Sequence, residues 1–262
     1  MIRPFRRCAA WTRGHARRFA VPLVALAWLA AAPVADAGQV DLELVLAVDA
    51  SSSVDDLEFQ LQMDGLAKAF RHPKVIEAIT AATPGGLAVT LVQWSGIGIR
   101  SRAVDWMVVR DAFSSVAFAA EIDQAPRIVA GGATALGNAI SYATALLQTN
   151  LYQGKRRIID VSGDGINNEG EYAATARHRA VEAGITVNGL AILNDEPNLA
   201  RYYLAGVVGG PGAFVLTAVD FADFALAIRQ KLIMEITGGS ISEAPRPVRT
   251  KTAAAPTDPA SP

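Results

Sequence analysis

Residues 41–53 read DLELVLAVDASSS. Residues 41–48 begin with polar and apolar side chains in alternation and end as a continuous apolar run, which is typical of a buried strand in a parallel sheet. Asp49 follows directly, and three serines come after Ala50. The stretch therefore predicts a strand that delivers a carboxylate and several hydroxyls to its carboxyl end, where open parallel sheets bind their ligands.

Strand-like and helix-like segments alternate along the chain that follows. Short apolar runs predict five more strands, over residues 87–94, 99–108, 157–161, 185–192 and 213–217. Helical spacing of apolar residues predicts helices over residues 55–71, 110–120, 135–148, 171–183, 198–207 and 221–236. Such alternation predicts an α/β fold of three layers, with a doubly wound, mostly parallel six-stranded sheet and helices on both faces.

The two ends of the chain differ from this pattern. Six arginines precede an apolar run over residues 19–32, and Ala35-Asp36-Ala37 has the small-residue pattern of a cleavage site, so residues 1–37 are predicted to be a secretory signal peptide. The apolar run is shorter than the roughly 20 residues of a membrane-spanning helix, and an uncleaved N-terminal anchor is the alternative. Residues 240–262 are rich in Pro and Ala and are predicted to be a disordered tail. One domain, residues 38–239, lies between them.

Charge and cysteine content narrow the classes of partner. Residues 1–37 hold six of the 24 Lys and Arg residues and one of the 25 Asp and Glu residues, so the remainder carries a net charge of −6. A nucleic-acid partner would require a basic patch, so none is expected, whereas bound cations suit an acidic chain. The single cysteine, Cys8, lies in the predicted signal peptide. We expect a periplasmic or secreted protein without internal disulfides.

Oxygen-bearing side chains lie at three places where a predicted strand ends or a predicted helix begins. Asp49, Ser51 and Ser53 come after the first strand, Thr134 ends a Gly-Gly-Ala-Thr loop before a helix, and Asp164 follows the strand at 157–161. Because the carboxyl ends of parallel strands share one sheet edge, these side chains are expected to converge. Carboxylates and hydroxyls are the ligands of hard cations, so the set predicts a Mg²⁺ site, with Mn²⁺ or Ca²⁺ as alternatives.

The same three motifs resemble a known family. D-x-S-x-S at 49–53, G-G-x-T at 131–134 and Asp164-Gly165 together are similar to the metal-ion-dependent adhesion site of von Willebrand factor A and integrin I domains, as is Trp94-Ser95. The resemblance covers about residues 40–237 and points to an uncharacterised secreted bacterial type. One departure is Gly163 before Asp164, where the family commonly has Thr.

The resemblance implies a function. The metal would be held by Asp49, Ser51, Ser53, Thr134 and Asp164 with one coordination position open, and an acidic side chain of a partner protein would complete its shell. The family also implies that the last helix, over residues 221–236, can shift when the partner binds. A membrane would be reached only through an uncleaved signal.

Each motif also has an ordinary structural explanation. Asp49 and the serines could cap the helix that begins near residue 55, Thr134 could cap the next helix, and Asp164-Gly165 could be a simple turn. Ile166 stands where a calcium-binding EF-hand loop requires an oxygen ligand, so residues 167–169 are expected to form a solvated loop at the rim. Asp160, inside a strand, is expected to pair with Arg156 or Arg157.

Catalytic motifs are absent from the sequence that follows the signal peptide. It contains two histidines and no cysteine, and it has neither a G-x-S-x-G elbow nor a phosphate-binding glycine motif. We therefore expect a protein-binding module and no enzyme. A metal-assisted phosphate-ester hydrolase is the alternative, and a scaffold with a vestigial metal site is a third reading.

Overall fold

The computed structural model describes residues 38–239. The predicted signal peptide and the predicted Pro/Ala-rich tail lie outside these residues. Across residues 38–239, every helix is too short or too polar to cross a membrane.

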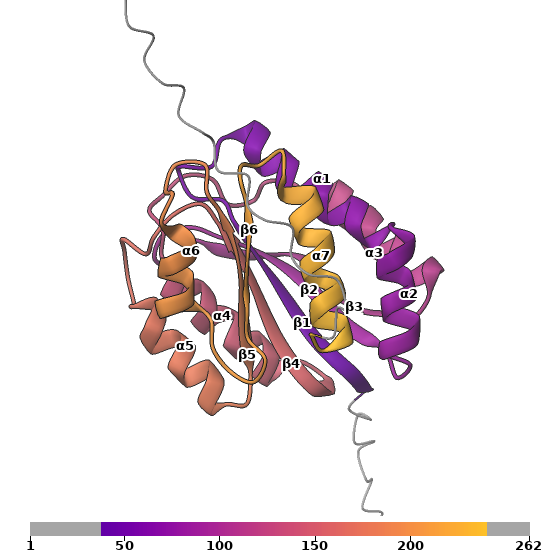
Figure 1. Cartoon of the computed structure of the whole chain (residues 1–262). Coiled ribbons are helices and arrows are strands. Elements are labelled where there is room, and N and C mark those ends of the chain that lie inside the picture. The colour runs from indigo at the N-terminus through magenta and orange to yellow at the C-terminus, as the bar shows by residue number, and fades with distance from the viewer. Residues whose placement is uncertain (1–37, 240–262) are drawn as a thin grey trace, which may run out of the picture. The chain divides into compact units, whose positions relative to one another are not determined.

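A six-stranded sheet forms the middle layer (Figure 1). Its strands are β1 (Gly38–Asp49), β2 (Leu87–Trp94), β3 (Arg100–Val109), β4 (Tyr152–Gly163), β5 (Thr186–Ile192) and β6 (Val215–Ala218). The spatial order is β3-β2-β1-β4-β5-β6, and only β3, at one edge, runs antiparallel. The predicted doubly wound, mostly parallel sheet is confirmed.

Within residues 38–239, six α-helices and one π-helical turn connect the strands, and a seventh α-helix follows the last strand. They are α1 (Asp56–Phe70), α2 (Pro73–Ala82), α3 (Ala112–Gln124), α4 (Leu136–Thr149), α5 (Ala173–Glu182), α6 (Leu199–Tyr202), the turn η1 (Tyr203–Val207) and α7 (Phe224–Thr237). Helix α2 was not predicted, because Pro73 reads as the end of the preceding helix. In the structure Pro73 occupies the first turn of α2, where its missing N–H costs nothing, and His72 caps that helix.

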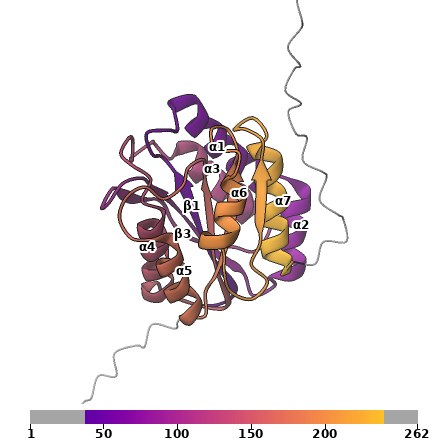
Figure 2. The same cartoon turned by 60° about the vertical axis from the view of Figure 1, so that its left-hand side comes forward.

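Two hydrophobic clusters hold the layers together. On one face of the sheet, Leu42, Leu44, Leu46 and Val48 of β1 pack with residues from α1, α2, α3 and α7. On the other face, β1 contributes Val45 and Ala47 to a cluster with α4, α5 and α6. Figure 2 shows α4 and α5 on one side of the sheet and α2 and α7 on the other. Because both faces of β1 are covered over residues 44–48, this part of the strand is apolar at every position.

The chain reverses its winding direction between β1 and β4. From β1 it proceeds through α1 and α2 to β2 on one side, and β4 lies on the other side of β1 and leads through α5 to β5. Helix α1 packs on one face of the sheet and α5 on the other. The chain therefore leaves β1 and β4 toward opposite faces of the sheet, and the carboxyl ends of two such strands are the usual position of a ligand in this architecture.

Candidate metal centre

The structure brings the side chains at the ends of β1 and β4 together. Asp49 Oδ1 accepts a hydrogen bond of 2.8 Å from the Ser51 amide. Ser51 Oγ lies 3.3 Å from Ser53 Oγ, which donates a 2.8 Å hydrogen bond to Asp164 Oδ1. Because residues 53 and 164 are far apart in the chain, this contact results from the sheet topology. Four of the five predicted ligands thus form one continuous cluster.

Thr134 reaches the same cluster from the start of α4. A Cβ atom built on Gly165 would lie 3.3 Å from Thr134 Oγ1, so the Thr134 hydroxyl faces the turn that follows Asp164. The loop before it is tied down on both sides, since Ser52 N donates to Gly132 O and Ser95 Oγ donates to Gly131 O. Gly132 has a positive φ of 91°, and a side chain there would meet Ser95 Oγ, so glycine is required.

The capping explanations of these residues are wrong. The cap of α1 is Asp55, which forms a reciprocal capping box with Glu58. Helix α4 has Ala135 at its N-cap and no side-chain cap hydrogen bond, so Thr134 does not cap it. Asp49 and Thr134 therefore have no helix-end role that would account for their burial.

Both carboxylates are buried and incompletely satisfied. Asp49 is fully buried and Asp164 is 2% exposed, and Asp49 Oδ2 and Asp164 Oδ2 have no hydrogen-bond partner among the described residues. Burial, followed by repulsion from Asp164, raises the pKa of Asp49 to about 7. Burial also raises the pKa of Asp164. The surroundings of both carboxyl groups thus disfavour their ionised form. A bound cation would favour the ionised form instead.

The loop after β4 is exposed to half-buried, as its polar sequence predicts, and its side chains also make specific contacts. Asn168 holds Thr134 in both directions: its Oδ1 accepts from Thr134 N at 2.8 Å, and its own N–H donates to Thr134 O at 3.0 Å. Asn167 Oδ1 accepts from Gly137 N, and Glu169 Oε2 accepts from Ile97 N. These contacts tie the loop after Asp164 to the loops around residues 97 and 134, and Asn168, four positions after Asp164, positions Thr134.

A tyrosine that the sequence analysis did not single out lies beside the carboxylates. Tyr203 is fully buried, and its hydroxyl has no hydrogen-bond partner among the described residues. Burial and the neighbouring Asp49 raise the pKa of Tyr203 well above its usual value, so the group remains a protonated donor. The signal that could have revealed it is glycine inside β4 and β5, since isolated strand glycines mark close approach of another group.

A second buried carboxylate pair lies beneath α7. Lys231, with no exposed surface, bonds Asp160 Oδ1 at 2.7 Å and Glu235 Oε1 at 2.6 Å. The expected partners of Asp160 were wrong: Arg156 donates to the backbone carbonyls of Glu235 and Ile236, and Arg157 to that of Ala183. Those arginines sit on the same strand as Asp160, whereas the true partner comes from the helix packed over it.

The donor set suits a hard cation. Among residues 38–239, no three His, Cys, Asp or Glu side chains gather around one point, so the cluster offers two carboxylates supplemented by hydroxyls. Magnesium prefers oxygen ligands and retains several waters, and unsatisfied buried carboxylate oxygens are the groups it would neutralise. The residues present fit a divalent cation with incomplete protein ligation.

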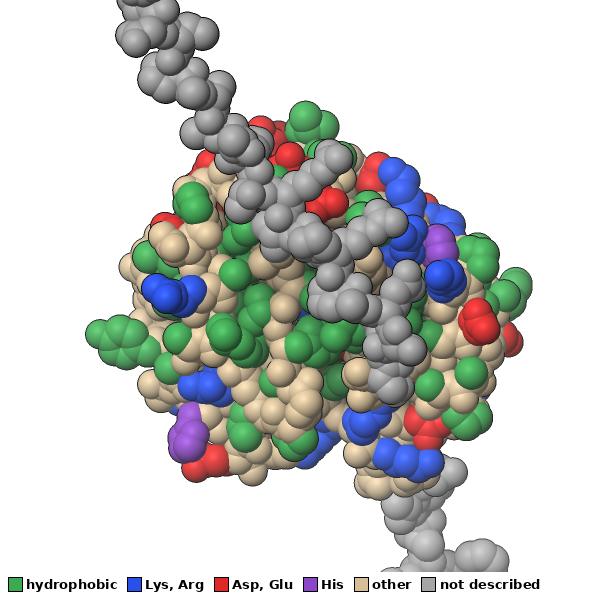
Figure 3. All heavy atoms as spheres, in the orientation of Figure 1, with side chains coloured by type: hydrophobic (Ala, Val, Ile, Leu, Met, Phe, Trp, Pro, Cys, Tyr) green, Lys and Arg blue, Asp and Glu red, His purple; other side chains and the backbone are tan. Residues whose placement is uncertain are grey.

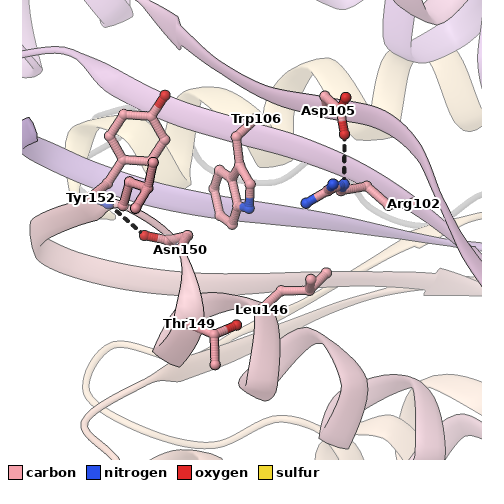
Figure 4. A pocket seen from close by; sticks show the side chains of 8 residues that line it. Arg102, Asp105, Trp106, Leu146, Thr149, Asn150 and Tyr152 are labelled. Atoms are coloured by element: carbon pink, nitrogen blue, oxygen red, sulfur yellow. Dashed lines mark hydrogen bonds and ion pairs between the residues drawn. The ribbon is translucent and has the colours of Figure 1, made fainter. Parts of the chain in front are cut away.

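The surface hollows lie elsewhere. One hollow of about 370 Å³ is lined by residues from β3, the end of α4 and the start of β4, with Trp106 and Tyr152 facing it (Figure 4). Arg102 and Asp105 at its side pair with each other at 2.7 Å. Figure 3 shows acidic side chains along the upper edge of the molecule, where β1 ends and α1 begins. These hollows therefore do not mark the carboxylate cluster, whose two aspartates are buried where β1 and β4 end.

Comparisons with known proteins agree with the fold. The family model described as "Protein of unknown function (DUF1194)" matches residues 39–240. No curated protein matches the chain. Among solved structures, proximal thread matrix protein 1 from the mussel byssus is 16% identical with a TM-score of 0.58, and the match covers 76% of this chain and 49% of that one.

Two bacterial structures are also similar. A von Willebrand factor type A protein from Catenulispora acidiphila is 19% identical, with a TM-score of 0.54, over 75% of this chain and 43% of that chain. The von Willebrand factor domain of the type V pili tip protein Mfa5 from Porphyromonas gingivalis is 12% identical, with a TM-score of 0.53, over 79% and 98%. This chain spans about half the length of the first structures that it matches. At these identities the likenesses establish the fold.

Proposed function

Since this chain belongs to the DUF1194 family and has a von Willebrand factor A-like fold, we propose that it is an exported protein-binding module that depends on a divalent metal. The proposed ligands are Asp49, Ser51, Ser53, Thr134 and Asp164. Mg²⁺ is the proposed ion, with Mn²⁺ or Ca²⁺ as alternatives. A carboxylate of a partner protein completes its coordination.

One observation carries the proposal. Asp49 and Asp164 are buried beside each other, and each has a carboxylate oxygen without a donor. Burying an ionised carboxylate without a partner is costly, and proteins pair such groups or use them to bind metals. No Lys or Arg approaches either carboxylate within ion-pair distance in the described part of the chain. A cation from solution is the remaining partner.

The chemistry of the ligands favours binding to a partner. Three of the five proposed ligands are hydroxyls, which bring no charge, and six positions are needed for octahedral Mg²⁺. At least one position is left for water or for a carboxylate from another molecule. An acidic side chain would be the strongest competitor for that position because it is both charged and a hard oxygen donor.

The similar structures support this class of function. One structure of the mussel thread protein has a zinc-occupied MIDAS motif, and a pilus adhesin, SpaC from Lactobacillus rhamnosus GG, is also similar. These are properties of those proteins, and they favour an adhesive role for the same fold here. The proposal of export rests on residues 1–37, whose arginines and apolar run have the pattern of a signal peptide.

Calorimetric titration tests the metal site. We expect the wild-type protein to bind Mg²⁺ or Mn²⁺ with one-to-one stoichiometry and Asp49→Ala to lose measurable binding. Asp105→Ala is the matched control, because Asp105 is an exposed aspartate on β3 that pairs with Arg102. Equal affinity of wild type and Asp49→Ala would remove Asp49 from the site and with it the proposal.

Partner binding and catalysis are tested separately. Capture from an envelope extract should retain a protein in the presence of Mg²⁺ and release it with a chelator, and Asp49→Ala should retain none. We expect no turnover of a chromogenic phosphate ester at high protein concentration. Turnover that a chelator abolishes would instead favour the metal-assisted hydrolase.

A further inference from the structure

Two glycines in adjacent strands make room for the ring of Tyr203. A Cβ atom on Gly189 of β5 would lie 2.5 Å from Cδ1 of Tyr203, and a Cβ atom on Gly163 of β4 would lie 3.0 Å from its hydroxyl. The ring therefore lies over β5, and its hydroxyl reaches the carboxyl end of β4. Glycine inside a strand weakens it. Since two strand positions are glycine where a side chain would collide with Tyr203, the placement of this tyrosine has a cost that a purely space-filling residue would not require.

The hydroxyl of Tyr203 and the carboxylate of Asp49 both lie near the position that a Cβ atom of residue 163 would occupy. The Cβ atom that Gly163 lacks would be 2.6 Å from Asp49 Oδ2 and 3.0 Å from Tyr203 Oη. Both oxygens are buried, and neither has a hydrogen-bond partner among the described residues. Two unsatisfied oxygens, one acceptor and one donor, therefore flank the space above Gly163.

We propose that Tyr203 is a positioning residue of the cation site, whose hydroxyl donates a hydrogen bond to a water held beside Asp49 Oδ2. This inference rests on the proposed metal function and assigns to it a residue outside the motifs at 49–53, 131–134 and 164–165. A water at that place has an acceptor in Asp49 and a donor in Tyr203, and the cation supplies its third partner. The bridge fixes the orientation of the Asp49 carboxylate.

The departure of this sequence at residue 163 has the same explanation. Gly163 precedes Asp164 where a side chain would strike Asp49 Oδ2 and the tyrosine hydroxyl. Tyr203 itself begins the π-helical turn η1, in which Val208 N–H bonds to Tyr203 O at 3.0 Å. Single π-helical turns are frequently found at functional sites. The π-helical turn and the two glycines together place the Tyr203 hydroxyl near the Asp49 carboxylate.

A purely structural role of Tyr203 makes a different prediction. Phenylalanine would fill the same volume above Gly189 without burying an unsatisfied hydroxyl, so a structural tyrosine would be replaceable at no loss. Partners that orient a metal ligand typically contribute 10- to 100-fold in metal affinity. Replacement of the hydroxyl alone therefore separates the two roles.

The test is titration of the full chain with Mg²⁺ alone. We expect Tyr203→Phe to raise the dissociation constant about 10- to 100-fold, with a melting temperature in chelator equal to or above that of the wild type. Tyr152→Phe, at the opposite end of β4, is the matched control and should bind as the wild type does. Mg²⁺ should also perturb the near-ultraviolet tyrosine band of the wild type and of Tyr152→Phe but not that of Tyr203→Phe.

The outcomes distinguish the two proposals. Equal Mg²⁺ affinity of wild type and Tyr203→Phe overturns the role of Tyr203 and leaves the metal site standing. Absence of binding to the wild type overturns both. If Tyr203→Phe does not fold, the wild-type spectrum decides: a tyrosine band that Mg²⁺ leaves unchanged contradicts the bridge.

Discussion

The molecule buries two pairs of carboxylates, and it treats them differently. Beneath α7, Asp160 and Glu235 hold the ammonium of Lys231 between them at 2.7 and 2.6 Å. At the carboxyl ends of β1 and β4, Asp49 and Asp164 lie close enough for Asp164 to raise the pKa of Asp49, with no such cation from the described chain. For the pair at α7, the chain supplies its own counter-charge. For the pair at the sheet edge, we propose that a cation from solution supplies it.

The position of each pair agrees with this difference. Lys231 lies on the buried face of α7 and has no exposed surface, so no ion from solution could take its place. The edge pair belongs to loops that diverge at the switch point of the sheet, and Ser53 in the same cluster is exposed. Predictions that alter one pair and leave the other intact can therefore confirm or break the contrast.

The largest expected effect is on the pair beneath α7. Lys231→Met leaves Asp160 and Glu235 buried without a cation, and breaking a buried ion pair in this way costs about 3–5 kcal/mol of unfolding free energy. Urea unfolding at pH 8 measures it, and Lys68→Met, in a surface pair with Asp64, is the control with an effect below about 1 kcal/mol. A loss of that small size for Lys231→Met would mean that the pair needs no counter-charge.

The second prediction concerns the stability gained when the proposed Mg²⁺ binds beside Asp49 and Asp164. Mg²⁺ at about 100 times its dissociation constant should raise the unfolding free energy of the wild type by about 2.7 kcal/mol. The same increment should appear in a folded Lys231→Met protein, because its lesion lies in the other pair. Thermal or urea unfolding with and without chelator measures both, and an increment of zero in the wild type would contradict the metal site.

The third prediction removes a charge from the edge without adding metal. In chelator at pH 8, Asp49→Asn should raise the free energy of unfolding, since it relieves the burial and repulsion that shift the pKa of Asp49. The same variant should gain nothing from Mg²⁺. If the two pairs differ as described, Asp49→Asn raises the free energy of unfolding and Lys231→Met lowers it. A destabilised Asp49→Asn protein would show that the carboxylate is satisfied without metal.

The fourth prediction concerns pH. The pKa of Asp49 in the folded protein is about 7, above the ordinary 3.8, so the metal-free protein loses stability from this group as pH rises between those values. Mg²⁺ competes with the proton, so its apparent affinity should fall about tenfold, or 1.4 kcal/mol, for each pH unit below 7. Calorimetry in buffers of different ionisation enthalpy should detect proton release on binding. Affinity independent of pH between 5.5 and 7 would contradict it.

The fold and the motif cluster were predictable because both depend on local pattern. Strand and helix periods follow the chain, and residues after parallel strands must meet at one edge whatever their distance in sequence. The convergence of Asp49, Ser53 and Asp164 follows from strand order alone. Their role as metal ligands stays a prediction.

Contacts set by packing were not predictable. Lys231 pairs with Asp160 because α7 lies over β4, and the Tyr203 hydroxyl lies near Asp49 because two strand glycines let its ring approach. Nothing in local periodicity specifies which helix covers which strand residue. The boundary between α1 and α2 failed for another reason: a proline after a helix either ends it or starts the next one, and the sequence alone does not distinguish these.

The smallest expected effect tests the amides that support each pair. Asn168 Oδ1 accepts from Thr134 N at the edge, while Asn188 donates to Glu235 Oε1 at 2.9 Å beneath α7. Asn168→Ala removes one of two hydrogen bonds that hold Thr134, so Mg²⁺ affinity should fall about fivefold, roughly 1 kcal/mol. Asn188→Ala should lower stability by a similar roughly 1 kcal/mol and leave Mg²⁺ affinity unchanged. Titration measures the Mg²⁺ affinity of both variants, and urea unfolding measures their stability. If Asn188→Ala weakened Mg²⁺ binding as much as Asn168→Ala, the two pairs would be one coupled network, and the division between a fold pair and a ligand pair would be wrong.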